Sequence, residues 1–239
     1  MNLTITDVRV LSGDCAFLLD NGHTAVLYDT GFGFTGARIA ENIRKQLGGR
    51  KLDYILLTHS HYDHVLATPH ILRAYPQAKV IAGEYAARIF AKPSARATMR
   101  ALDLSAAQKQ GMDDYEDLAD ALKVDIAVKD GDEIVCGDMT FSVIALPGHT
   151  KCSVGFYMKE NGLLLGTETL GVYFGQEDYL PSYLVGYQLS MDSFERAKAL
   201  DVQQLLIPHY GVVGQREARA FLEGSQRAAQ DTAMRIKAI

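Results

Sequence analysis

Three histidines and one aspartate lie within six residues of the chain, in the stretch His59-Ser60-His61-Tyr62-Asp63-His64. Imidazole and carboxylate groups are common ligands of divalent metal ions. The stretch follows residues 52–57, a largely apolar run that is typical of a buried strand. Side chains alternate along an extended chain, so His59 and His61 should point to the same side. We therefore predict a loop that supplies half of a two-metal site, with a solvated polar turn as the alternative.

Three further candidate ligands each follow an apolar run and stand in or just beyond a turn: His149, Glu168 and His209. Five of the seven histidines of the chain fall in these positions or in the stretch 59–64. Random placement would rarely give this distribution, which favours a site assembled from several strand ends.

These residues resemble the pattern of the metallo-β-lactamase superfamily. The His-x-His-x-Asp-His stretch at 59–64 matches its signature, and Pro-Gly-His-Thr at 147–150 matches its second ligand turn. The resemblance runs from Asp29 to His209 and so covers most of the chain. It implies an α+β fold, a four-layer αββα sandwich with metals at one edge.

The resemblance also implies a set of metal ligands. One metal would be held by His59, His61 and His149. The other would be held by Asp63, His64 and His209. Glu168 stands where the family carries a bridging aspartate. We expect two divalent ions, with zinc favoured and iron or manganese as alternatives.

Four residues are candidates for the chemistry itself. Glu168 would bridge the metals, and Asp63 could also accept a proton from the nucleophile. Tyr173 and Tyr210 could donate a hydrogen bond to an oxyanion, or could simply pack in the core. In the resembled family Asp29 lies under the metal loop, where it would either orient a histidine or serve as a plain turn residue.

The resulting hypothesis is a metal-dependent hydrolase that uses a metal-bridging hydroxide on a small ester, lactone or thioester. The first alternative is a di-iron or mononuclear-iron redox enzyme on the same fold. The second is a ligand-binding regulatory protein with a vestigial site. An aromatic-rich segment at 171–189 would form a wall of the pocket or pack in the core.

The length of 239 residues fits a single domain over 1–239. Residues 92–123 have no strand pattern, so we predict an insertion with helices at about 94–101 and 114–123. This insertion would either cap the active site or form a surface decoration or a homodimer contact. A helix is also expected at 36–47, and another from Thr68 to about Tyr75 that would leave His70 on the surface.

The charge pattern narrows the partners. The net charge is −5 and no Lys/Arg cluster is present, so we expect a small-molecule substrate rather than a nucleic acid. No apolar run approaches the roughly 20 residues of a membrane span, and Met1–Asp7 does not resemble a signal peptide. Cys15, Cys136 and Cys152 are odd in number and widely spaced, which suggests reduced thiols and a cytoplasmic protein. Cys152, near His149, is expected to be a small buried residue rather than a metal ligand.

Overall fold

The computed structural model describes residues 3–238, and the chain divides into two compact units. Unit 1 runs up to Val128 and includes Cys136–Met139, whereas unit 2 comprises Lys129–Val135 and the residues from Thr140 onward. The ends of the predicted single domain, residues 1–2 and 239, lie outside the described residues. No described helix is long and apolar enough to cross a membrane.

The described part of unit 1 is built on a six-stranded sheet with the order β1-β2-β3-β4-β5-β6. Its strands are β1 (Thr4–Asp7), β2 (Phe17–Asp20), β3 (Ala25–Tyr28), β4 (Tyr54–Leu57), β5 (Lys79–Gly83) and β6 (Ile126–Val128). The first three strands pair antiparallel, and β3 to β6 pair parallel. Carboxyl ends of parallel strands meet at one edge, so the segments that follow β3 and β4 begin at the same edge.

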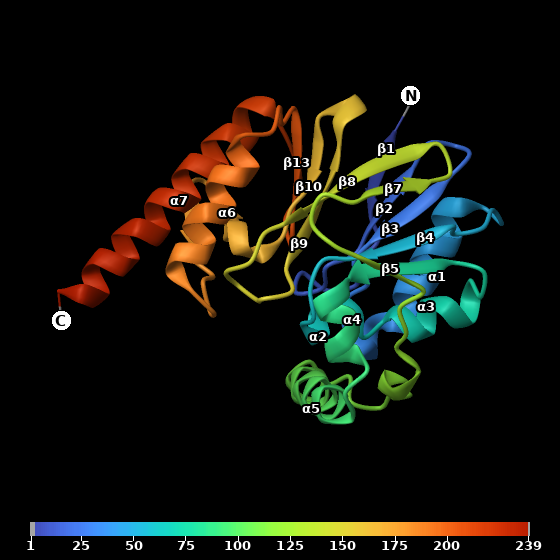
Figure 1. Cartoon of the computed structure of the whole chain (residues 1–239). Coiled ribbons are helices and arrows are strands. Elements are labelled where there is room, and N and C mark those ends of the chain that lie inside the picture. The colour runs from blue at the N-terminus through green and yellow to red at the C-terminus, as the bar shows by residue number, and fades with distance from the viewer. Residues whose placement is uncertain (1–2, 239) are drawn as a thin grey trace. The chain divides into compact units, whose positions relative to one another are not determined.

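The helices of unit 1 flank this sheet. They are α1 (Gly36–Leu47), α2 (Tyr62–Val65), α3 (Thr68–Ala74), α4 (Glu84–Phe90) and α5 (Pro93–Lys109). The prediction for 36–47 is confirmed: Ile39, Ile43 and Leu47 are buried at helical spacing. The helix ends at Gly48, whose φ of 58° suits a left-handed cap. Figure 1 shows α1 and α3 side by side.

His70 on α3 was expected at the surface, and that prediction is wrong. Its side chain is buried against the start of α1, where a Cβ at Gly36 would come within 2.8 Å of the His70 ring. The glycine therefore lets the two helices approach closely enough to cover the imidazole.

The insertion also differs from its prediction. Helix α5 is one continuous helix of 17 residues, and the predicted helix at 114–123 is only a 3₁₀ turn, η2 (Ala119–Ala121). Acidic side chains of this segment bind arginines from other helices. Glu116 pairs with Arg73 at 2.6 Å, and Asp120 pairs with Arg100 at 2.8 Å. These ion pairs link the segment to α3 and α5.

A second six-stranded sheet has the order β14-β13-β10-β9-β8-β7 and lies in unit 2 except for Cys136 and Met139 at the ends of two strands. Its strands are β7 (Glu133–Cys136), β8 (Met139–Ala145), β9 (Val154–Met158), β10 (Leu163–Leu165), β13 (Gln204–Ile207) and β14 (Gly211–Gly214). Strand β10 is parallel to β13 and antiparallel to β9, which is antiparallel to β8. Strands β8, β10 and β13 therefore run in the same direction and end at one edge.

Two long helices and a small hairpin complete unit 2. They are β11 (Val172–Gly175), β12 (Asp178–Leu180), α6 (Tyr187–Lys198) and α7 (Gln215–Lys237). Figure 1 shows α6 and α7 side by side, and they enclose Phe194, Phe221 and Leu222 in the core. The segment predicted as an aromatic loop thus contains a β-hairpin and the first turn of α6.

Candidate metal centre

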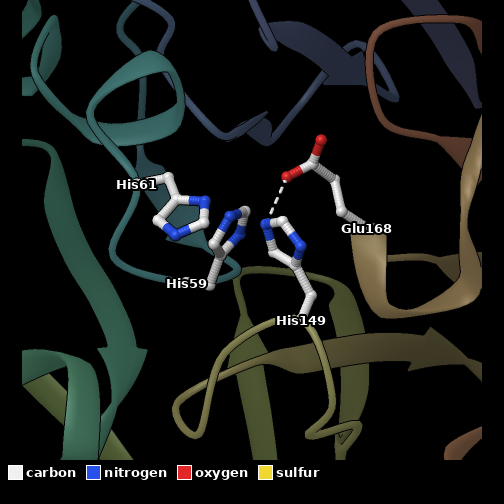
Figure 2. Close-up of side chains that lie close together, drawn as sticks. All are labelled: His59, His61, His149 and Glu168. Atoms are coloured by element: carbon white, nitrogen blue, oxygen red, sulfur yellow. Dashed lines mark ion pairs between the residues drawn. The ribbon is translucent and has the colours of Figure 1, made fainter. Parts of the chain in front are cut away.

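The loop after β4 gathers three imidazoles in unit 1. The ring centroids of His59 and His61 are 4.7 Å apart, and those of His59 and His64 are 4.1 Å apart. His61 is the extended residue before α2, so the chain turns into that helix between His61 and His64. Figure 2 shows the rings of His59 and His61 turned toward each other at the end of this loop.

Two residues behind the loop fix the orientation of two of these rings. The Thr58 hydroxyl donates to Asp29 Oδ2 at 2.8 Å and lies 3.0 Å from His59 Nδ1. Because the Thr58 hydroxyl donates its proton to the hydrogen bond with Asp29, it acts as the acceptor for His59, and Nδ1–H of His59 donates to it. Asp29 Oδ2 likewise lies 2.8 Å from His64 Nδ1 and accepts a hydrogen bond from its N–H. In both rings the metal-binding lone pair is then on Nε2.

Asp29 directly follows β3 and is completely buried. Its φ is 50°, in the left-handed region, and its Oδ1 accepts the Thr58 backbone N–H at 2.8 Å. Of the two roles considered for Asp29, its contacts are those of a residue that orients a histidine. The segments that follow β3 and β4 are thus joined through one carboxylate.

The surroundings of His64 favour positive charge on its ring. Burial alone lowers the pKa of His64, but Cys15, Asp63 and Asp29 together raise it well above the usual value. Asp63 Oδ2 lies 3.7 Å from His64 Nε2. A site that stabilises a proton here also suits a divalent cation.

The cysteine next to this cluster is Cys15. Donor atoms of Cys15, Asp29 and His64 lie within 4.8 Å of one another, and all three residues are buried. Sequence spacing had drawn attention to Cys152, which is buried as expected and has its sulfur 3.2 Å from the Thr150 hydroxyl.

In unit 2 the strand directions bring three separate donors to one edge. His149 follows β8, Glu168 follows β10 and His209 follows β13. His149 Nδ1 lies 3.0 Å from the Ser182 carbonyl oxygen and 2.7 Å from the Ser182 hydroxyl. The carbonyl can only accept, so Nδ1 carries a proton and Nε2 is the nitrogen that faces Glu168.

Glu168 links the two histidines of this unit. It begins a 3₁₀ turn, η4 (Glu168–Leu170), and is 8% exposed. Its Oε2 lies 2.7 Å from His149 Nε2, the ion pair drawn as a dashed line in Figure 2. Its Oε1 lies 3.3 Å from His209 Nε2. Each oxygen of one carboxylate therefore faces a different histidine.

The two candidate tyrosines lie together in unit 2. Their ring centroids are 4.6 Å apart, and Tyr173 also packs on Tyr179 and Phe221. Tyr210 is 41% exposed. These contacts account for both rings as packing residues, and a role as oxyanion donors stays a prediction.

Sequence reasoning missed several supporting residues. Thr58 and Ser182 hold histidines, and Asp14 and Asp103 are buried acids on other segments of the chain. For Asp103 a pattern was available, because Met99, Asp103 and Ala107 share one face of α5 and all are buried. For Ser182 no comparable pattern exists, since its contact depends on the loop before α6.

The donor chemistry fits divalent metals. His59, His64 and His149 each hold the Nδ1 proton against a protein acceptor, which is the usual support of a metal-bound imidazole. Asp63 supplies a carboxylate beside His64, and Glu168 supplies one beside His149. Nitrogen and carboxylate donors of this kind suit zinc, iron or manganese.

Comparison with known sequences gives matches over much of the chain. The model of the metallo-beta-lactamase superfamily matches residues 10–209. A hydroxyacylglutathione hydrolase from Francisella tularensis is 30% identical over 120 residues, which are 50% of this chain and 34% of the relative. One from Synechococcus is 34% identical over 84 residues, which are 34% of this chain and 31% of the relative. The chain thus matches about a third of the length of these curated relatives.

Solved structures share the fold at low identity. A superfamily protein from Sulfolobus tokodaii has a TM-score of 0.65 at 20% identity, covering 87% of this chain and 78% of its own. A subclass B3 metallo-beta-lactamase of Bradyrhizobium japonicum has a TM-score of 0.60 at 23% identity, with coverages of 93% and 88%. A flavo di-iron protein from Thermotoga maritima has a TM-score of 0.64 at 18% identity, with coverages of 90% and 52%. The chain has the predicted α+β fold and belongs to the metallo-beta-lactamase superfamily.

Proposed function

We propose that this protein is a dinuclear metal-dependent hydrolase of a small ester, lactone or thioester. The observation that carries the proposal is the position of Glu168, whose two oxygens face His149 and His209 separately. The family resemblance assigns those histidines to different metals. A carboxylate that already contacts one ligand of each metal is suited to bridge the pair.

The proposed ligand sets follow the family pattern. His59, His61 and His149 would hold one ion. Asp63, His64 and His209 would hold the other, with Glu168 between them. Two divalent ions supply a water of lowered pKa at neutral pH and polarise the carbonyl of the substrate. Zinc is the first choice because imidazole nitrogens dominate both sets.

The protein's own groups have separate tasks in this proposal. Asp29 and Thr58 keep the Nδ1 protons of His64 and His59 in place, so each ring presents Nε2 to the metal. Asp63 is half-buried, and its carboxylate would take a proton from the nucleophile and pass it to the leaving group. Glu168 would supply negative charge to the proposed pair of ions, which would lower their mutual repulsion.

The relatives indicate where to begin with substrates. Two of them are named hydroxyacylglutathione hydrolase, and an acyl thioester therefore comes first in the panel. The panel should also contain an ester, a lactone and a phosphodiester of similar size.

The test combines metal analysis with this panel. Protein purified without added metal, and then reconstituted with zinc, manganese or iron, should hold about two ions per chain by elemental analysis. A chelator should abolish hydrolysis, and the metal should restore it. Less than one ion per chain after reconstitution, or turnover unaffected by the chelator, would refute the proposal.

A further inference from the structure

A cavity of about 350 Å³ lies in unit 1 beside the metal loop. Its lining is mixed: Leu11, Phe32, Phe34, Tyr62 and Ala106 are apolar, and Ser12, Ser105 and Gln110 are polar. Tyr62 stands in the chain between His61 and Asp63, both candidate metal ligands. One end of the cavity therefore adjoins the loop where the proposed chemistry takes place.

Three aromatic rings line this cavity. Phe32 and Phe34 stack with centroids 4.8 Å apart, and Tyr62 lies 5.6 Å from Phe32. Both phenylalanines are buried. Such a surface binds aliphatic or aromatic carbon by removing it from water.

Two buried carboxylates connect the chain segments that line the cavity. Asp14, which is fully buried, accepts the Phe32 N–H at 3.1 Å through Oδ1 and the Leu11 N–H at 2.8 Å through Oδ2. Asp103 on α5 is 1% exposed and accepts the Gly33 N–H at 2.9 Å. The cavity is thus held by hydrogen bonds inside the protein, which makes it a preformed pocket.

The pocket has one charged side chain in its described lining. Among the described residues that line it, Lys109 near the end of α5 carries the only charge. A larger cavity of about 650 Å³ also borders Phe34, but both arginines and carboxylates line it, including the paired Arg73 and Glu116. No residue of 58–64 lines that larger cavity. The smaller pocket combines an aromatic surface, one cation and a residue of the metal loop.

We propose that this pocket binds the acyl part of the substrate and that Lys109 pairs with a carboxylate at the far end of that acyl group. The inference rests on the proposed function and adds a substrate class to it: esters or thioesters of medium-length dicarboxylic acids. Helix α5 would then determine substrate specificity as one wall of the site.

The kinetic test uses a matched pair of esters on the zinc-reconstituted full chain. Mono-4-nitrophenyl adipate and 4-nitrophenyl hexanoate have six-carbon acyl groups and differ in the terminal carboxylate. We expect a lower KM for the adipate ester by roughly threefold, as suits one partly exposed ion pair. Lys109→Gln should remove that difference, and Lys92→Gln at the other end of α5 should keep it.

A second substitution probes the apolar part of the lining. Ala106→Leu places three additional carbons in the pocket and should raise KM for the hexanoate ester by roughly tenfold, with a smaller rise for 4-nitrophenyl acetate. Ala101→Leu on an exposed part of α5 is the matched control. Equal effects of Ala106→Leu and Ala101→Leu, or an adipate preference that survives Lys109→Gln, would overturn the assignment.

A binding experiment separates this inference from the proposed function. Calorimetry on the chelator-treated protein should show monomethyl adipate binding more tightly than methyl hexanoate, with the difference lost in Lys109→Gln. If metal-loaded protein hydrolyses no ester or thioester but this binding pattern holds, the proposed function fails and the pocket assignment stands. If hydrolysis occurs and neither compound binds in the pocket, the pocket assignment alone fails.

Discussion

Buried carboxylates have different positions in the two units. In unit 1, Asp29 lies behind the metal loop and accepts hydrogen bonds from Thr58 and His64. In unit 2, Glu168 lies in front of its histidines, on their Nε2 atoms. The first acid therefore orients imidazole rings from behind, whereas the second contacts the Nε2 atoms of its two histidines.

This difference predicts different consequences of losing each acid. Removing a carboxylate that orients a ring weakens a metal site but leaves every ligand present. Removing a carboxylate that binds the metals takes away a ligand and a negative charge together. The predictions below test the two situations in order of expected effect.

The largest effect is expected for Glu168→Ala. Two cations would face each other with less negative charge between them, so the second metal should be lost and hydrolysis should fall by roughly a thousandfold or more. Glu168→Asp should retain more activity than the alanine variant, because a carboxylate remains at the position. Elemental analysis and kcat measure the two losses.

The next acid along the chain supplies the control for that variant. Glu177 is exposed on the turn between β11 and β12, so Glu177→Ala should retain two metals and full activity. An alanine variant at 168 that binds two metals normally would show that Glu168 has no role as a ligand.

A smaller effect is expected for Asp29→Asn. Asparagine tolerates the positive φ of this position, and loss of the carboxylate weakens the support of His64 and Thr58. Affinity for the metal proposed to bind His64 should fall by roughly 10- to 100-fold, the range for such supporting groups. Competition with a chromophoric chelator measures it, with the exposed Asp114→Asn as control. An unchanged affinity would mean that the hydrogen bonds of Asp29 do not support the site.

The third prediction concerns stability and Asp103. Burial raises its pKa from 3.8 to about 6, despite hydrogen bonds from Tyr115 and Gly33 that lower it, and the nearby Asp117 raises it further. The folded state holds the proton more tightly, so the contribution of Asp103 to stability is greatest below about pH 4 and declines as pH rises through about 6. The decline attributable to this group should be at most about 3 kcal/mol.

Urea unfolding of the metal-free protein between about pH 4 and 7 measures this decline. Asp103→Asn keeps an acceptor for Gly33 but cannot ionise, so its difference from the parent should change with pH over this window. The exposed Asp113→Asn should follow the parent. A constant difference for Asp103→Asn would exclude the raised pKa.

Sequence alone located features whose cause is local. The stretch 59–64 carries its donors within six residues, and α1 carries its apolar spacing and its glycine cap in one segment. The segment 114–123 was predicted as a helix, whereas its Glu116 and Asp120 pair with Arg73 and Arg100, which are distant in sequence. The hydrogen bonds that Asp14 and Asp103 accept from Phe32 and Gly33 were missed as well, because these partners are distant in sequence and meet only after folding.

Two residues of the candidate site have left-handed backbones without being glycine: Asp29, with φ of 50°, and His209, with φ of 62°. Such a backbone disfavours β-branched side chains and admits Asp, Asn and His more readily. The set of residues that evolution or a mutagenesis library can sample at these two positions is therefore small. More substitutions are available on the side of α5 that lines the pocket, because a helical backbone accepts most side chains. Changes of substrate are therefore easier to obtain there than at Asp29 or His209.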